Sequence, residues 1–251
     1  MNRKNTSITI FSKFLFTAIF ILFFSNASFS QLEHIKVFSD YSVANSKKLS
    51  TVKADGLGGG IGVSFNLFDN FNLGVQVGYN LYSVSQDSAL EQWKWDFWEY
   101  RYKGNVKNDT ASDPNLSSRI DVAQKMDAIP VVITLNYKFS LLDELDVRPT
   151  VGGGFLYFSR RLYLEENWKK VYPAYNNYTF EYSYRNFAPN KTGYPFLITA
   201  GLNINYKLSE LIALAGDFQY NSIIKTEGKN GYDDLPFNNS FSFKLGITFL
   251  Y

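Results

Sequence analysis

The last eleven residues, 241–251, constrain the fold more than any other part of the chain. Apolar side chains occupy every second position from Phe241 to Tyr251, and Ser, Lys, Gly and Thr stand between them, with Leu250 as the one exception. Successive side chains of a β-strand point to opposite faces. This spacing therefore predicts a strand with one apolar face and one largely polar face.

The same alternation recurs along the chain. It predicts eight strands, at about residues 35–43, 57–67, 71–81, 129–139, 145–159, 194–206, 212–220 and 241–251. The less apolar faces are mostly Gly, Asn, Thr and Ser, whereas a soluble exterior would carry many more Lys and Glu. The first strand is the least regular, because Phe38 falls on its polar face.

The connections between these strands alternate in length. Tight turns are predicted near Asp69, Asp143 and Glu210, and long segments span about residues 44–56, 85–126, 160–193 and 225–239. Short periplasmic turns and long extracellular loops are typical of transmembrane barrels. The sequence thus predicts an all-β fold: an eight-stranded antiparallel up-and-down transmembrane β-barrel with its apolar face outward.

The amino terminus has the form of an export signal. Arg3 and Lys4 precede an apolar run at residues 14–24, and the small residues Ser28 and Ser30 follow it. We expect residues 1–30 to be a cleaved signal peptide and residues 31–251 to form one outer-membrane barrel domain. The chain has no cysteine and a net charge of +2, so neither a disulfide framework nor nucleic-acid binding is expected.

These features together resemble the porin-like outer-membrane β-barrel domain family, the small eight-stranded barrels of Gram-negative bacteria. The resemblance rests on the signal peptide, on the terminal Phe249-Leu250-Tyr251 and on inward glycines, namely Gly58, Gly60, Gly62, Gly152 and Gly154. It implies a location in the outer membrane, contact with outer-membrane lipid, and recognition of the terminal aromatic strand by the barrel-assembly machinery. Tyr251 departs from the family's usual terminal Phe.

Catalytic chemistry is not predicted. The one histidine, His34, is expected at the periplasmic rim, with no third group placed to orient it as a base. Glu165 and Glu166 are adjacent, so on a strand they point to opposite faces and are expected to be solvated loop charges. We expect no enzyme activity, no metal and no cofactor.

The barrel interior is a first candidate site. Four charged residues fall on inward faces: Lys138, Arg148, Asp217 and Lys244. Eight strands leave a lumen that side chains can fill, and buried charges need partners. Asp217 and Lys244 lie on adjacent strands and are able to pair. A structural polar plug is favoured over a narrow path for ions or small solutes.

The long loops are a second candidate site, because all four tryptophans lie in them. The candidate binding surface comprises Trp93, Trp95, Trp98, Tyr100, Trp168, Tyr178, Tyr182 and Tyr184. Residues 178–185 alternate again and predict a strand above the membrane. These aromatic residues either pack between the loops as an extension of the barrel wall, or form a surface for an extracellular protein or glycan ligand.

The favoured function is therefore a structural or surface-interaction role through aromatic-rich extracellular loops. A narrow pore for ions or small solutes is the first alternative. A secreted lipocalin-like barrel that binds an apolar ligand is a weaker one, because it requires the apolar faces to point inward.

Overall fold

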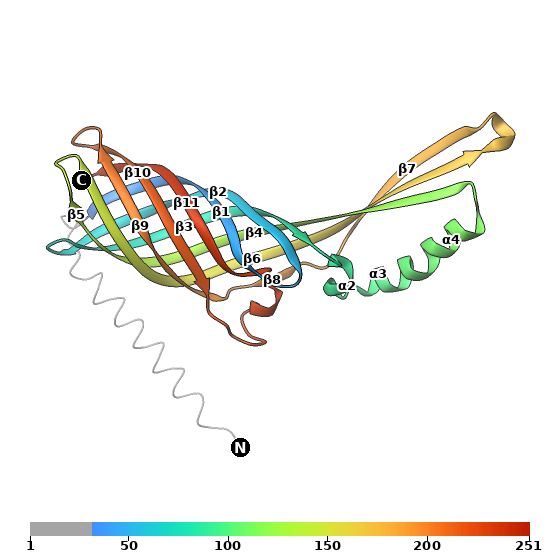
Figure 1. The fold of residues 1–251 in the computed structure, drawn as a ribbon, viewed down its shortest axis with the longest axis horizontal. Coiled ribbons are helices and arrows are strands. Elements are labelled where there is room, and N and C mark those ends of the chain that lie inside the picture. Colours follow the sequence, from blue (N-terminus) through green and yellow to red (C-terminus); the bar gives the residue numbers. More distant parts are fainter. Residues whose placement is uncertain (1–31) are drawn as a thin grey trace, which may run out of the picture.

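Eight antiparallel strands close into a ring in the computed structural model, which describes residues 32–251 (Figure 1). The predicted signal peptide, residues 1–30, lies outside the described residues. The ring strands are β1 (Leu32–Lys47), β2 (Thr51–Phe68), β3 (Phe71–Gln86), β4 (Leu116–Tyr137), β6 (Leu145–Tyr172), β9 (Phe196–Lys207), β10 (Ile212–Ile223) and β11 (Phe237–Leu250).

Neighbouring ring strands follow one another in sequence, apart from small extra elements. The order is β4-β3-β2-β1-β11-β10-β9-β6, and pairing of β4 with β6 closes the ring. A two-residue strand, β5 (Phe139–Ser140), pairs with the start of β6. Near the start of β1, the Tyr251 N–H donates to the Glu33 carbonyl at 3.0 Å. The predicted strand count and up-and-down topology are confirmed.

The outer wall of the ring is apolar. Its mid-strand side chains are large, hydrophobic and exposed, among them Val37, Leu57, Ile61, Ile133, Val151, Ile198, Leu214, Phe243, Leu245 and Ile247. Such a continuous apolar band is unfavourable in water, but it suits the hydrocarbon core of a bilayer, where closed barrels leave no backbone group unpaired. The wall therefore faces lipid. A lipocalin-like arrangement, with the apolar faces turned inward, is contradicted.

Strands run further beyond the lipid-facing zone than the alternation predicts. Residues 44–56 were expected to form a long loop, but β1 continues to Lys47 and β2 begins at Thr51, so the turn is short. Leu49 and Ser50 adopt positive φ there, at 53° and 52°. Outside the bilayer neither face of a strand must be apolar, so the period-2 signal disappears while the pairing continues.

The largest extension forms a unit that projects from one end of the barrel, opposite the carboxyl terminus (Figure 1). Its sheet contains the first part of β4, the last part of β6 and β7 (Tyr178–Phe187), in the order β4-β6-β7. The predicted strand above the membrane is thus present. We call residues 89–120 and 160–188 the projecting unit.

Short helices between β3 and β4 pack against this sheet. They are α2 (Ala89–Trp93), α3 (Asp96–Tyr100), the π-helix η2 (Arg101–Val106) and α4 (Lys107–Ser112). The remaining elements are η3 (Pro173–Tyr175), β8 (Lys191–Gly193) and η4 (Tyr232–Asp234). Of the helices in residues 32–251, none is long and apolar enough to cross a bilayer.

Two inward glycines serve different purposes. A Cβ at Gly74 would collide with the Thr134 side chain, so this glycine makes room for a neighbouring side chain inside the lumen. A Cβ at Gly154 would instead collide with the Val131 carbonyl oxygen on the adjacent strand. Gly154 therefore allows close approach of two backbones, a role that a count of lumen volume does not reveal.

Candidate functional site

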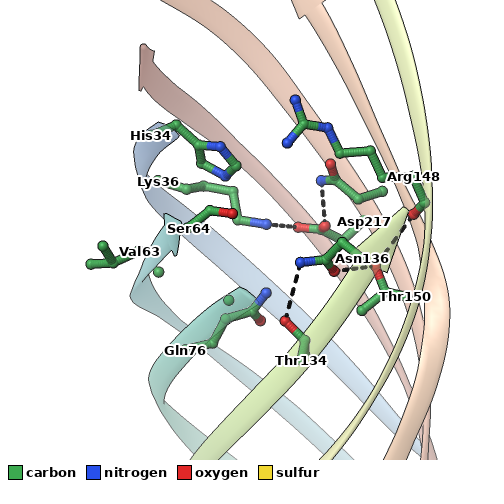
Figure 2. Close-up of a pocket in the computed structure, with 13 residues that line it drawn as sticks. His34, Lys36, Val63, Ser64, Gln76, Thr134, Asn136, Arg148, Thr150 and Asp217 are labelled. Carbon is green, nitrogen blue, oxygen red and sulfur yellow. Dashed lines mark hydrogen bonds and ion pairs between the residues drawn. The ribbon is translucent and has the colours of Figure 1, made fainter. Parts of the chain in front are cut away.

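An ion pair crosses the lower part of the lumen, the part nearer the turns. Lys36 Nζ of β1 lies 2.7 Å from Asp217 Oδ2 of β10, and both side chains are almost fully buried (Figure 2). Asn203 Nδ2 donates to the other oxygen of Asp217 at 2.5 Å. The carboxylate therefore has a partner for each oxygen, as a buried charge requires.

Arg148 lies between two carboxylates at the turn side of the lumen. Its Nη1 donates to Glu33 at 2.8 Å and its Nη2 to Asp146 at 3.3 Å. Lys138 Nζ is 3.4 Å from the same Asp146 carboxylate, and its side chain is partly exposed at the barrel mouth. Of the four predicted lumen charges, Lys138 thus belongs to the rim.

Lys244 is buried higher in the lumen, and it does not form the ion pair with Asp217 that adjacent strands would allow. The two residues are directly opposed in the β10–β11 register, but Asp217 binds Lys36. Lys244 Nζ donates to Gln76 at 3.0 Å and to Gln219 at 2.7 Å. Its ammonium group also lies 4.8 Å from the centre of the Phe38 ring, which explains an aromatic residue on the polar face of β1.

Side chains fill most of this polar lumen. A cavity of about 20 Å³ lies between His34, Lys36, Arg148 and Asp217 (Figure 2). A second cavity, of about 30 Å³, is lined by groups that include Asp40, Gln219 and Lys244. Each is of the order of the ~10–15 Å³ that one water centre requires. Neither is wide enough for a hydrated ion.

An apolar plug closes the lumen toward the projecting unit. Phe158, Met126 and Ala128 point inward from the wall and are fully buried. Leu235 and Phe237, which follow η4, pack against them and are 0% and 1% exposed. Sequence reasoning placed Leu235 in a long loop and missed this role. The Leu-Pro-Phe run at 235–237 was the available signal.

Tryptophans form the core of the projecting unit. Trp93 and Trp95 from the helical segment belong to one buried apolar cluster with Trp168 from β6. They are therefore not part of an exposed binding surface, because the helical segment needs an apolar interior to stay on the sheet. Trp98 and Tyr182 are partly buried against the same core. These five residues therefore pack between the loops, the first of the two arrangements considered above.

A buried carboxylate lies at the edge of this core. Glu166 is 0% exposed, so the expectation that it is a solvated charge is wrong. It accepts hydrogen bonds from Trp168 Nε1 at 2.9 Å and from Asn186 Nδ2. Adjacent Glu165 does point to solvent, where it binds Arg185 at 2.7 Å. The alternation was right, but it could not show which face the helices cover.

Other aromatic residues of the unit remain open to solvent. Tyr100 is 82% exposed, Tyr178 60% and Tyr184 54%. At the hairpin tip a shallow cleft of about 370 Å³ is lined by Tyr172, Tyr175, Tyr178 and Phe180. Next to this cleft, burial raises the pKa of the Tyr182 hydroxyl, and the charges of Tyr184 and Glu166 raise it further.

His34 lies at the turn side of the lumen, as predicted. Its Nδ1 is 3.1 Å from Glu33 Oε2, and it lines the lower cavity with Lys36 and Arg148. Within residues 32–251, no three His, Asp or Glu side chains converge as a metal site would require.

Comparisons with known proteins find similar chain paths but no sequence family. No protein-family model matches the chain, and no curated protein matches its sequence. The similar solved structures include the Neisserial surface protein A, at 13% identity and TM-score 0.40, covering 87% of this chain and 96% of that one.

Two further solved structures have a similar chain path. The outer membrane protein OprG of Pseudomonas aeruginosa has 10% identity and TM-score 0.44, covering 88% of this chain and 97% of its own. The attachment invasion locus protein Ail of Yersinia pestis, solved with the heparin analogue sucrose octasulfate, has 7% identity and TM-score 0.40, covering 88% and 99%.

Proposed function

We propose that this chain, an integral outer-membrane β-barrel, holds its projecting unit outside the cell as a binding surface for an extracellular protein or glycan. The observation that carries the proposal is the tyrosine cleft at the hairpin tip. Exposed aromatic side chains that gather on a rigid sheet are unusual without a partner. Tyrosine in particular is enriched at binding hot spots.

The filled lumen supports a display role over transport. The ion pairs near the turns and the apolar plug near the projecting unit occupy the two ends of the barrel. The barrel then acts as a stiff base. Its β4 and β6 continue without interruption into the projecting sheet, so the cleft is held on regular structure rather than on a mobile loop.

A binding assay on the mature chain, refolded in lipid vesicles, tests the proposal. The probes are an array of soluble glycans and a panel of purified extracellular proteins. We expect Tyr178→Ala to weaken binding of the retained probe by roughly tenfold or more, because truncating a hot-spot residue costs about 2 kcal/mol. Tyr163→Ala, on the opposite face of the hairpin, is the matched control. Equal effects of the two variants, or no binding by the native chain, would refute the proposal.

Conductance separates display from the pore alternative. We expect the mature chain, refolded in a planar bilayer, to give no single-channel steps, because the lumen cavities hold little more than one water each. Heat-modifiable gel migration confirms that the barrel is folded. Reproducible steps that are lost on replacing Arg148 or Lys244 would instead establish an open path.

A further inference from the structure

Strand β7 is an open edge of the projecting sheet. One side of it pairs with β6 along its whole length, from Tyr172 opposite Tyr178 to Tyr163 opposite Phe187. Within residues 32–251, no strand pairs with its other side. Alternate residues of an antiparallel edge strand direct both N–H and C=O away from the sheet. The open side of β7 is thus a template for one more strand.

Proline, lysine and a β-bulge, three common protections of an edge strand, are missing from β7, which carries only Glu181 and Arg185 as charged residues. Its ten residues, YTFEYSYRNF, contain no proline and no lysine. Its pairing with β6 shows no bulge. Aromatic residues and threonine favour the extended conformation. A long, regular and aromatic edge is the kind that other chains add to.

The two charged residues of β7 have opposite signs and lie at equal distances from Ser183. Glu181 lies two residues before it and Arg185 two residues after it, both exposed on the face away from the helices. When two copies of the strand pair in an antiparallel manner about Ser183, Glu181 of each copy faces Arg185 of the other. Parallel in-register pairing would place like charges opposite each other, which is destabilising.

The neighbouring strand continues this charge pattern. Within one chain Lys169 of β6 lies 3.2 Å from Glu181, and Glu165 of β6 lies 2.7 Å from Arg185. Antiparallel pairing of two copies therefore gives a row in which Lys169, Glu181, the other copy's Arg185 and its Glu165 alternate in sign. On the helix face the same register sets Tyr182 against Tyr184, an aromatic cross-strand pair.

We propose that β7 binds β7 of a second copy of this chain in antiparallel fashion, about Ser183. The strand runs from the tip of the projecting unit back toward the barrel (Figure 1). Antiparallel pairing hence points the two barrels in opposite directions, as in two membranes that face each other. This inference rests on the proposed display function and assigns it one partner: the same protein on an opposing membrane.

The register sets the spacing of the two membranes. Phe158, in the apolar plug two residues before the projecting unit begins on β6, is five residues from Tyr163, the partner of Phe187. Across the interface, Phe187 would face Thr179 of the second copy. In that copy Thr179 pairs with Val171 of β6, and β6 leads from Val171 back to its own Phe158. The path between the two Phe158 positions is about 18 residues long, or roughly 60 Å at the rise of a β-strand.

Clustering of vesicles that carry the full mature chain tests the pairing. Two vesicle populations with different dyes are mixed, and two-colour clusters are counted by flow cytometry. The native chain should cluster with itself. E181R alone and R185E alone should each reduce clusters at least tenfold, because each places like charges opposite each other at two positions. A mixture of E181R vesicles with R185E vesicles should cluster again.

The mixture excludes a folding defect, and a second mixture excludes a general attraction between oppositely charged vesicles. E181R vesicles mixed with K107E vesicles should cluster less than the native chain, because the arginine introduced at position 181 still faces Arg185 of the other copy. K107E, a charge reversal on exposed α4, is the control and should cluster like the native chain. Electron cryomicroscopy of the clusters should show the spacing given above. If the mixed variants cluster no better than each alone, or the native chain does not cluster, the inference is wrong. A failure to cluster would not contradict the binding of glycan or protein probes through Tyr178, which is a separate measurement.

Discussion

Replacing Asp217 with alanine is expected to destabilise the barrel by about 3–5 kcal/mol, the usual cost of removing one partner from a buried ion pair. Lys36 Nζ, 2.7 Å from Asp217, has a side chain that is 5% exposed. Without the carboxylate, this ammonium group would stay buried with no counter-charge. Asn203, which donates to the other oxygen, would lose its acceptor as well.

Urea unfolding of the chain in lipid vesicles, followed by heat-modifiable migration, measures this effect. Asp143→Ala, at an exposed turn position, should leave the unfolding midpoint unchanged. The double variant Lys36→Met with Asp217→Leu should recover most of the lost stability, because neither charge is then buried alone. A midpoint of Asp217→Ala equal to that of the native chain would show that Lys36 reaches solvent.

The contents of the lumen were largely predictable, but their pairing was not. Alternation alone assigned Arg148, Asp217 and Lys244 to the interior. It also held a signal for Asp146, which stands two residues before Arg148 and so shares its face. The partner of Asp217 lies on β1, two strands away in the ring, and contacts across a lumen depend on strand tilt and stagger. Sequence spacing does not contain that information.

The projecting unit was harder to predict, because water replaces lipid around it. In the bilayer an apolar residue must face out, so the pattern has one meaning. Above the bilayer an aromatic residue can be core or surface, and Trp168 and Tyr178 look alike in sequence. The helical segment covers one end of the sheet face, so Trp168 is buried beneath it and Tyr178 remains exposed. The burial of Glu166 was missed because the sequence does not show which face of the sheet the helices cover. Its hydrogen-bond partners, Trp168 and Asn186, lie on that same face.

Replacing Trp168 with alanine is expected to open the projecting unit while the barrel remains folded. Trp168 is 7% exposed and stacks on Tyr182, with ring centres 6.2 Å apart. Truncating a buried tryptophan costs about 3–5 kcal/mol, and here Glu166 also loses a hydrogen-bond donor. The apolar residues of this core all lie in the projecting unit, so the loss is expected to be local.

Limited proteolysis of vesicle-bound protein distinguishes a local effect from a global one. Trp168→Ala should be cut between residues 89 and 120 at least tenfold faster than the native chain, with heat-modifiable migration unchanged. Tyr100→Ala is the control, because Tyr100 is 82% exposed and its loss should not change the rate. If Trp168→Ala also abolishes heat-modifiable migration, then the projecting unit and the barrel fold as one cooperative body. The exposed tyrosines would then owe their fixed positions to the whole chain rather than to the tryptophan core.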